Sequence, residues 1–518
     1  MSQTVASLLY QDGTSLLYIS SLFLFILALK WLLFKRKANQ QYMLPPSPFT
    51  LPIIGNLHQL GLLPHRSLAL LAQRYGSVML LHLGNKRTLV VSSASAAEEI
   101  MKTHDACFAS RPDLRVMTKL SYDAEDAAIA PYGERWRYMR SLLVQHILSP
   151  KRVQSYRAIR EEATLLMMRK IEGSMGDPVD LSELLSLLPI GILCKVALGK
   201  NYCEGSGGKF RELLSELSAL SGAFDIGDSI PWLGWLNNFN GINSRVEKVF
   251  RSMDKIFSEI IEDHIAARSL ARSDEQMDAV DILLEIERKS STDGPVLTRK
   301  QIKGLMLDMF LGGTESTWTT MEWAMTELVR HPEIMKKAQR EIRSIVGNKD
   351  EVVVTAEDIA QMDYLKAVIK ETYRFHPPGP FLLPRESLQH VKVKGYDIPS
   401  KTRVWVNAWA IGRDPCSWDS PELFDPERFL RADSVASTRD FKGMSFELIP
   451  FGAGRRGCPA ISYASQIVEL GLASLLHKFD WSLPGGIMVE NLDATECFGT
   501  ILSRKYPLKL VAIPATAK

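Results

Sequence analysis

The sequence predicts a mainly α-helical protein with a small β region, preceded by a single N-terminal transmembrane helix. Three observations support this prediction: an apolar run near the N-terminus, long stretches with apolar residues at helical spacing, and two short stretches of β-branched and aromatic residues in the last third. The 518 residues are 46% hydrophobic and 23% charged, an ordinary globular composition. A formal net charge of +3 is too small to indicate nucleic acid as a partner.

The apolar run spans residues 16–34 and is followed at once by Lys35, Arg36 and Lys37. A helix of about 20 residues matches the roughly 30 Å hydrocarbon core of a membrane. A cleaved signal peptide is the alternative, but Asp12 is the only charge before the run and no A-x-A-like cleavage site follows. Positive charges after the span hold the C-terminal side in the cytosol.

Three parts of the chain follow from this pattern. Residues 1–37 are expected to form the membrane anchor. Residues 38–56 contain several prolines that resist helix and strand, and predict a stiff, extended hinge. No further linker interrupts the chain, so residues 57–518 are expected to form one large catalytic body.

The longest helix is predicted to begin at Thr298, where Thr298 and Gln301 form a capping box, and to continue to Pro332. About 33 residues at 1.5 Å each give roughly 50 Å, enough to cross the domain. Residues 312–317 replace strong helix formers with glycine, serine and threonine, which predicts a loosened or kinked segment in its middle.

A second helix is predicted over residues 363–375, because Pro377 denies it a backbone donor and restricts the residue before it. Strands are predicted over 390–399 and 402–409, where apolar, β-branched and aromatic residues alternate with turn residues between. A small sheet therefore joins a mostly helical body.

The six cysteines are scattered, with no Cys-x-x-Cys pair, which excludes a common zinc site and a disulfide framework. Only Cys458 lies among residues that suggest a functional role: glycines and arginines surround it in the segment FGAGRRGCPA at 451–460. Pro459 suits the first turn of the helix that follows, which sets Cys458 at a helix N-terminus, where a thiolate is favoured. Glycines at 452, 454 and 457 permit backbone geometries closed to other residues.

A single sulfur implies that any metal here is held mainly by something else, such as a porphyrin. A phosphate-binding loop is the alternative, since glycines before a helix also serve phosphate. The G-x-G-x-x-G and G-x-x-x-x-G-K-[ST] spacings are absent from this segment, and no strand pattern precedes it.

This segment resembles the haem-binding loop of the cytochrome P450 family through Phe451, Gly454, Arg456 and Cys458. Segments 376–387 and 406–429 resemble plant microsomal A-type members. Four further motifs resemble the family's in the family's order: Trp136 and Arg140 as W-x-x-x-R, residues 312–316 as the oxygen-activation motif, Glu371 and Arg374 as E-x-x-R, and Arg428 in P-E-R-F. The resemblance implies the cytochrome P450 fold.

Two positions depart from the family pattern. Ala460 replaces the usual glycine, and alanine is tolerated at a position already in a helix. Ser316 replaces the usual threonine. Serine retains the hydroxyl but loses the methyl that restricts rotation, which weakens control over oxygen protonation.

The resemblance implies a haem-dependent monooxygenase that inserts one atom of O₂ into a small apolar plant metabolite, such as a terpenoid, alkaloid or phenylpropanoid. Electrons are expected from NADPH through NADPH-cytochrome P450 reductase, docked near Arg135, Arg137 and Arg455. The implied location is the endoplasmic reticulum membrane, with lipid contact and a cytosolic catalytic domain. Two alternatives stay open: a haem-thiolate dehydratase or isomerase, against which Glu315 and Ser316 argue, and a catalytically silent haem or lipid binder.

The resemblance also assigns roles to single residues. Cys458 is the expected metal ligand. The expected proton-relay residues are Glu315, Ser316 and Thr317. The expected haem-binding residues are Arg111, Trp136, Arg140, Arg385, Phe451, Gly454, Arg456 and Cys458. The expected substrate-pocket residues are Leu311, Gly312, Phe381, Leu382 and Phe498. The expected structural residues beneath the haem are Glu371, Arg374 and Arg428.

One further segment, residues 229–239, has an apolar cluster around Trp232 and Trp235 in an expected loop between helices. Tryptophan favours the membrane interface, so this loop is expected to dip into the bilayer beside the anchor. A locally packed loop is the alternative.

Overall fold

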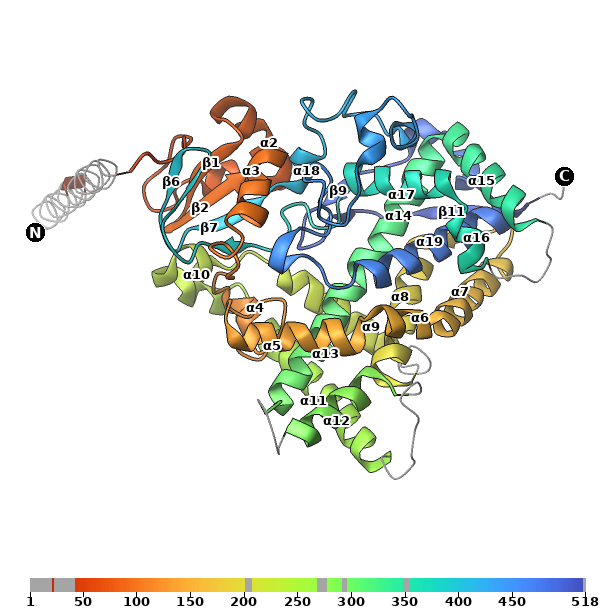
Figure 1. Ribbon diagram of the computed structural model, residues 1–518, viewed down its shortest axis with the longest axis horizontal. Coiled ribbons are helices and arrows are strands. Elements are labelled where there is room, and N and C mark those ends of the chain that lie inside the picture. The colour runs from red at the N-terminus through yellow and green to blue at the C-terminus, as the bar shows by residue number, and fades with distance from the viewer. Residues whose placement is uncertain are drawn as a thin grey trace, which may run out of the picture.

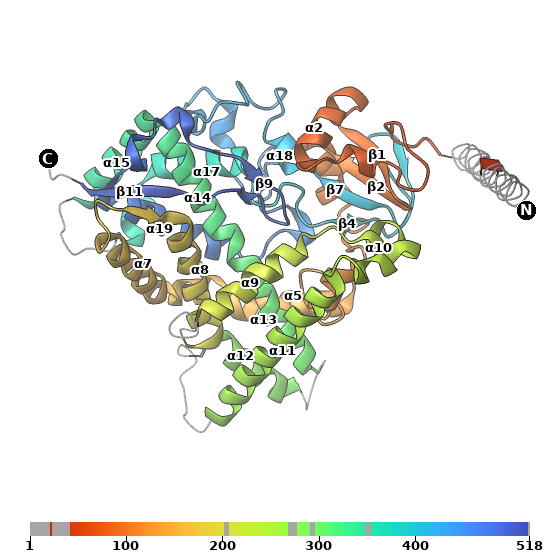
Figure 2. The same cartoon turned by 180° about the vertical axis from the view of Figure 1, so that it is seen from behind.

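The computed structural model describes residues 21–22, 42–200, 207–267, 277–290, 296–347 and 354–515. The predicted anchor therefore lies outside the described residues, apart from 21–22. Helices dominate and the strands form small sheets, as the sequence predicts (Figure 1). Strands β1 (Val78–Leu83) and β2 (Lys86–Val91) lie at one end of the molecule and α15 (Pro332–Val346) at the other in both ribbon views (Figures 1 and 2).

The helices differ widely in length, and most of them surround one large core. Their bounds are α2 (Pro64–Tyr75), α3 (Ala94–Glu98), α4 (Arg115–Leu120), α5 (Glu134–Leu142), α6 (Pro150–Ser155), α7 (Arg157–Glu172), α8 (Leu181–Leu198), α9 (Gly207–Ser221), α10 (Ile226–Ser229), α11 (Ile242–Ala267), α12 (Ala279–Ser290), α13 (Arg299–Gly313), α14 (Glu315–Arg330), α15 (Pro332–Val346), α16 (Ala356–Ala360), α17 (Asp363–Phe375), α18 (Ala408–Ile411) and α19 (Ile461–Lys478). Among the short 3₁₀ segments, η4 (Pro231–Asn238), η6 (Pro426–Phe429) and η8 (Gly454–Arg456) concern the function.

The strands form one mixed sheet and three smaller antiparallel ones. In the mixed sheet the order is β1-β2-β7-β4, with β2 and β7 parallel. The predicted strand regions are confirmed as the β5–β6 hairpin and β7. The remaining bounds are β3 (Pro178–Asp180), β4 (Arg385–Glu386), β5 (Val391–Val393), β6 (Tyr396–Ile398), β7 (Arg403–Val406), β8 (Phe479–Ser482), β9 (Glu496–Cys497), β10 (Ser503–Arg504) and β11 (Lys509–Pro514).

The predicted long helix is present but divided into α13 and α14, which together cross the body (Figures 1 and 2). The capping box of Thr298 and Gln301 starts α13. Thr314, with φ −98° and ψ −68°, interrupts the helix inside the predicted kink segment. The helix predicted over 363–375 is confirmed as α17.

The predicted hinge is not a free arm in its described part. Met43 makes two hydrogen bonds with Asp397: its amide donates to the Asp397 carboxyl at 2.9 Å, and its carbonyl accepts from the Asp397 amide at 2.8 Å. The Leu80 amide donates to the Pro46 carbonyl at 2.9 Å. Backbone groups of the hinge thus hydrogen-bond to the edges of β6 and β1. These bonds fix the described end of the hinge on the body.

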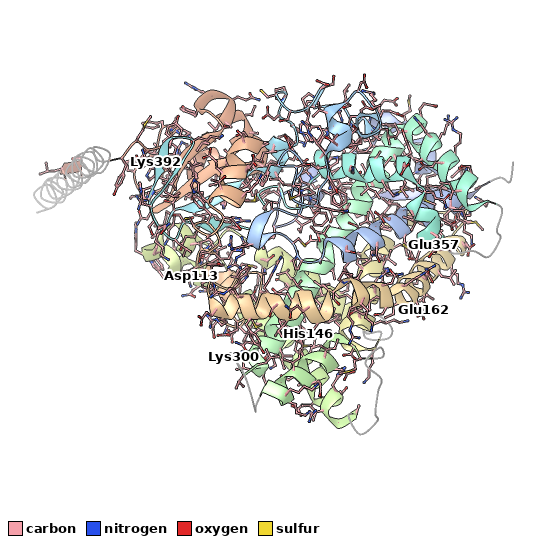
Figure 3. All side chains as sticks on the ribbon, in the orientation of Figure 1. Asp113, His146, Glu162, Lys300, Glu357 and Lys392 are labelled. Carbon is pink, nitrogen blue, oxygen red and sulfur yellow. The ribbon has the colours of Figure 1, made fainter. Side chains whose placement is uncertain are left out.

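The largest core cluster unites α8, α14, α17 and α19, and charged side chains such as Glu162, Lys300 and Lys392 lie on the outside (Figure 3). Within the described residues, α8 is the one helix long and apolar enough to cross a membrane, and 61% of it is buried inside the protein. It is therefore a core helix.

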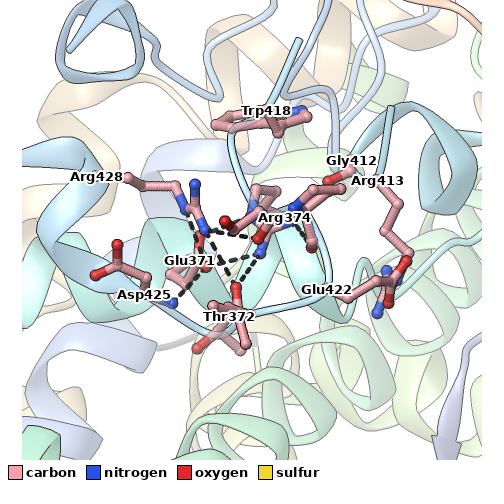
Figure 4. Close-up of polar contacts among 12 residues, drawn as sticks. Glu371, Thr372, Arg374, Gly412, Arg413, Trp418, Glu422, Asp425 and Arg428 are labelled. Atoms are coloured by element: carbon pink, nitrogen blue, oxygen red, sulfur yellow. Dashed lines mark hydrogen bonds and ion pairs between the residues drawn. The ribbon is translucent and has the colours of Figure 1, made fainter. Parts of the chain in front are cut away.

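A buried ion network joins α17 to the loop that ends in η6 (Figure 4). Arg374 donates to both Glu371 oxygens at 2.7 Å, and Arg428 donates to Glu371 at 3.2 Å. Glu371, at 0% exposed, also accepts from the Asp425 amide at 2.8 Å. Both arginines donate further to loop carbonyls, including that of Leu423. The predicted structural triad therefore joins residues far apart in sequence, which a surface i,i+3 pair does not do.

Replacing Glu371 with alanine is expected to lower the free energy of unfolding by about 3–5 kcal/mol, because two arginines lose a buried charged partner. Urea unfolding of the full-length protein measures this change. The matched control is Glu216→Ala, which removes an exposed ion pair with Arg245 and is expected to change little. Equal effects of the two substitutions would contradict the structural role.

Candidate functional site

The segment around Cys458 is a tight loop held by its own backbone. The Cys458 amide donates to the Phe451 carbonyl at 2.9 Å, which closes the loop. Gly452 and Gly454 have φ of +66° and +68°, and a Cβ on Gly454 would lie 2.2 Å from the Met101 carbonyl oxygen. The predicted need for glycine is confirmed at these two positions.

Gly457 has a different role from the one predicted. Its φ of −57° is open to any residue. An added Cβ would instead lie 3.2 Å from the Gly454 carbonyl oxygen. Glycine here relieves crowding inside the loop and does not supply an unusual backbone angle.

The helix after the loop begins later than predicted. Pro459 is not in its first turn, because α19 starts at Ile461 with Ala460 as the N-cap, so the prediction was wrong by two residues. The Ala460 amide donates to the Cys458 sulfur at 3.4 Å, so the sulfur does accept from the helix end. Burial raises the pKa of the Cys458 thiol, against the lowering effects of this amide and of Arg140. Binding to a metal displaces such a proton.

Four arginines gather on one side of this loop. Arg111, Arg385 and Arg456 are buried and Arg140 is half-buried. Burial lowers the pKa of Arg456 to about 9, and Arg385 and Arg140 lower it further. Burial likewise lowers the pKa of Arg111, and the charges of Arg456 and Arg385 lower it further. Cations that repel one another in the interior indicate a site for an anionic group.

Backbone carbonyls orient these arginines. Arg456 donates to the Ala109 carbonyl at 2.6 Å and to the Ala130 carbonyl at 2.5 Å, and its guanidinium lies 4.4 Å from the centre of the Trp136 ring. Arg385 donates to the Ala453 carbonyl at 2.7 Å. Trp136 and Arg140 lie four residues apart on α5 and so share one helix face.

Asp105 is a site residue that the sequence did not single out. Its carboxyl binds Arg385 at 3.3 Å and accepts from the Arg455 amide at 2.9 Å, beside the close approach at Gly454. In the sequence, the one signal for Asp105 is that it lies shortly before the segment FASRP, 108–112, which contains Arg111. Of the residues expected to dock the reductase, Arg455 is paired with Asp105, Arg135 is paired with Glu125, and Arg137 lies over the Tyr132 ring.

A haem fits the residues that meet here. Its carboxylates match the arginine cluster, its flat ring matches the close backbone approach of a glycine loop, and its iron takes a thiolate ligand. Cys458 would ligate the iron. Trp136 and the four arginines of the cluster would hold the carboxylates.

An acidic side chain, Glu315, lies at the break between α13 and α14. Burial raises the pKa of Glu315 to about 7, so this carboxyl holds a proton near neutral pH. Ser218 on α9 donates to the Glu315 carboxyl. The sequence gave no signal for Ser218, because α9 and α14 meet only in the fold.

Hydroxyls beside Glu315 bind the carbonyls of the preceding turn. These hydroxyls give hydrogen-bond partners to carbonyls near the break. Side-chain hydrogen bonds of this kind also bend a helix. The three hydrogen bonds are Thr314 to Phe310 at 2.7 Å, Ser316 to Gly312 at 2.8 Å and Thr317 to Gly313 at 3.0 Å. Thr317 is buried and Ser316 is half-buried.

The expected pocket residues fall into separate groups. Phe381 stacks on Trp405 at 5.1 Å between ring centres and meets Phe498 edge-on at 5.9 Å. Leu382 lies beside the cysteine loop, 3.7 Å from a Cβ added to Gly452. Leu311 packs against the apolar cluster that includes Met117 and Ile129. A Cβ added to Gly312 would meet no atom of the described chain within 4 Å.

Comparisons with known proteins agree with this geometry. A family model described as Cytochrome P450 matches residues 45–511. The chain is 48% identical over 493 residues to Cytochrome P450 736A117 of Prunus mume, covering 94% of each chain. It is 44% identical over 516 residues to norfluorocurarine oxidase of Strychnos, covering 97% of this chain and 98% of that one. A solved zebra fish cytochrome P450 with progesterone has a TM-score of 0.74 at 25% identity, covering 87% of this chain and 99% of the other.

Cys458→Ala is expected to abolish thiolate ligation, because the loop offers no second sulfur to replace it. The absorption spectrum of the reduced, CO-bound protein measures this loss. Cys194→Ala, which removes a buried cysteine of the core cluster, is the control and is expected to keep the thiolate-type band. An unchanged thiolate-type band in Cys458→Ala would contradict the assignment of the ligand.

Proposed function

The chain belongs to the cytochrome P450 family and is a monooxygenase, and from this premise we propose that it oxidises a small apolar plant specialised metabolite with electrons from NADPH. The observation that supports the proposal most is a half-buried acid with a raised pKa, Glu315, at a helix break, together with a cysteine loop beside clustered arginines. Terpenoids, alkaloids and phenylpropanoids are the substrate classes we propose. A plant relative named norfluorocurarine oxidase, 44% identical to this chain, supports an organic compound as the substrate.

When bound, haem supplies the redox chemistry that splits O₂, with one oxygen atom entering the substrate and the other leaving as water. The protein's part would begin with Cys458, whose thiolate would donate electron density to the iron. Arg111, Arg385 and Arg456 would neutralise the carboxylates of the haem and hold its orientation. Their fixed partners are backbone carbonyls, so the cations are oriented before the cofactor binds.

Glu315 holds the proton that this reaction consumes. A carboxyl with a pKa of about 7 is protonated in a large fraction of molecules at neutral pH and still releases its proton readily. Ser316 stands next to it, with its hydroxyl hydrogen donated to the Gly312 carbonyl at 2.8 Å and its oxygen lone pairs able to accept. Glu315 and Ser316 retain the family's oxygen-activation motif, which favours a monooxygenase over a dehydratase or isomerase that does not use O₂.

The membrane association is also proposed. We assign residues 1–37 to a single-pass anchor in the endoplasmic reticulum, 38–56 to the hinge and 57–518 to a cytosolic catalytic domain that receives electrons from NADPH-cytochrome P450 reductase. Trp232 and Trp235 support a second lipid contact, because in η4 they are 57% and 56% exposed.

The segment that carries these tryptophans is fixed close to the described part of the hinge. The Asn85 amide in the β1–β2 turn donates to the Ser229 carbonyl at 2.8 Å, next to α10. Figures 1 and 2 both show α10 at the same end of the molecule as β1 and β2. Exposed tryptophan at the end of the molecule that carries the described part of the hinge favours the interface over a locally packed loop.

Ser316→Ala is expected to keep haem and substrate binding but to lower the amount of product formed per NADPH oxidised by several-fold, with hydrogen peroxide released instead. Ser316→Thr is expected to preserve or improve this ratio, since the added methyl restricts the rotamer without removing the donor. Turnover with a reductase and a compound that shifts the haem absorption band measures the ratio.

Thr317→Ala is the control for this experiment, because Thr317 has a hydroxyl with the same type of hydrogen bond, to Gly313 at 3.0 Å. Equal coupling in the wild type and in Ser316→Ala would exclude the serine from the relay.

A chain that begins at Gln41 is expected to remain partly bound to membranes at low salt, and the substitutions Trp232→Ser and Trp235→Ser are expected to release it. Sedimentation with vesicles measures the bound fraction. The control pair is Trp481→Phe with Trp418→Phe, two tryptophans that are at most 9% exposed. Complete release of the shortened chain without any substitution would leave η4 without a lipid contact.

A further inference from the structure

The first half of α13 lies directly against the loop before α5. Gln301 donates to the Glu125 carboxyl at 2.9 Å. One turn later, a Cβ on Gly304 would lie only 2.4 Å from the Glu125 carbonyl oxygen. Asp308 comes four residues after Gly304, so helical spacing places it on the same face. This face is therefore built for close contact with the loop.

Two aspartates bind every amide of one short segment, residues 127–130. Asp308 accepts from the amides of Ala127 at 2.7 Å and Ala128 at 3.3 Å. Asp126 accepts from the next two amides, those of Ile129 at 3.0 Å and Ala130 at 2.9 Å. All four donors of segment 127–130 are thus held by two carboxyls.

The two carboxyls lie close enough for each to change the pKa of the other. Burial raises the pKa of Asp308 well above its ordinary range, and the charge of Asp126 raises it further. Burial raises the pKa of Asp126 to about 6, opposed by the amide of Ile129 and by Asp308. The pair therefore favours a proton, and favours it on Asp308 more than on Asp126.

The carbonyls of segment 127–130 bind the haem-site residues. The Ala127 carbonyl accepts from the Trp136 indole at 3.0 Å. The same carbonyl accepts from Arg456 at 3.3 Å. The Ala128 carbonyl accepts from Arg111 at 3.0 Å. The segment thus connects the aspartate pair to two arginines of the cluster.

We propose that Asp126 and Asp308 are positioning residues that hold segment 127–130 so that Arg111 and Arg456 are directed at the carboxylates of the haem. This inference rests on the proposed function, in which haem binds at Cys458. Neither aspartate contacts the cofactor in this role. They act through the backbone between them and the arginines.

The charge balance gives the pair a dependence on pH. Loss of the proton on Asp308 puts two negative charges together, opposed by Arg456 and Arg111 on the loop side. On the other sides lie Glu125, paired with Arg135, and the neutral Gln301. Because Asp308 has a raised pKa, its proton leaves at a higher pH than the proton of an ordinary aspartate. Haem is expected to dissociate faster as this proton leaves.

The test measures the rate at which the full-length haem protein loses haem to an excess of a haem-binding acceptor, together with the reduction potential. In Asp308→Asn the amide oxygen still accepts from both backbone amides and the NH₂ donates to Asp126. We expect a rate within about twofold of the wild type, without the alkaline acceleration. Asp308→Leu leaves two buried amides without partners, and we expect haem loss about tenfold faster or more, with a lowered potential.

Glu322→Gln on α14 is the matched control, since it removes another buried acid with a raised pKa and is expected to leave haem loss and its pH profile unchanged. Haem loss from Asp308→Leu at the wild-type rate would overturn the proposal. Faster haem loss at high pH that persists in Asp308→Asn would also overturn the proposal. This result can be read even where the leucine variant does not fold. Absence of the thiolate-type band in the wild type would instead mark a failure of the proposed function.

Discussion

Burial of several arginines beside one sulfur is the constraint on which the rest of this structure depends. A buried cation needs hydrogen-bond acceptors, and carbonyls inside helices and strands are already paired. The acceptors for Arg111 and Arg456 are carbonyls such as those of Ala109, Ala128 and Leu383, all outside regular helices and strands. The irregular loops around the site are therefore required by the cations that they hold.

The chain contains two buried groups of arginines, and their partners distinguish their roles. Arg374 and Arg428 share the Glu371 carboxylate and are surrounded by loop carbonyls, so that network is complete within the protein. In the cluster near Cys458, burial lowers the pKa of Arg456, and the charges of Arg385 and Arg140 lower it further. The first arrangement stabilises the fold, whereas the second gains stability when an anionic ligand arrives.

Sequence motifs predicted the site well where each motif is local. The capping box at Thr298, the helix break at Thr314 and the tight loop before Cys458 were all predicted from short-range propensity. The start of α19 was placed two residues early, because proline was taken as its first residue while Ala460 forms the cap. Nothing local distinguishes a proline in the first turn from one in the preceding loop.

Contacts between distant segments were missed for a different reason. Ser218 reaches Glu315, and Asp126 reaches Asp308, only after helices separated by many residues have packed. One signal was available for Asp308: it is a lone charge in the apolar stretch LMLDMFL. A charge on the buried face of a helix needs a partner, although sequence alone does not say which.

Burial raises the pKa of both Asp308 and Glu315 on the long helix, yet their protons serve different ends. The Asp308 carboxyl lies beside Asp126 and accepts from two backbone amides, so loss of its proton would place two negative charges together against the segment that orients the arginines. The pKa of Glu315 is raised by burial alone, to about 7, and its partner is a serine hydroxyl that can rotate. Only the Glu315 proton can therefore leave and return without disturbing the backbone, which is what a reaction consuming protons in every cycle requires.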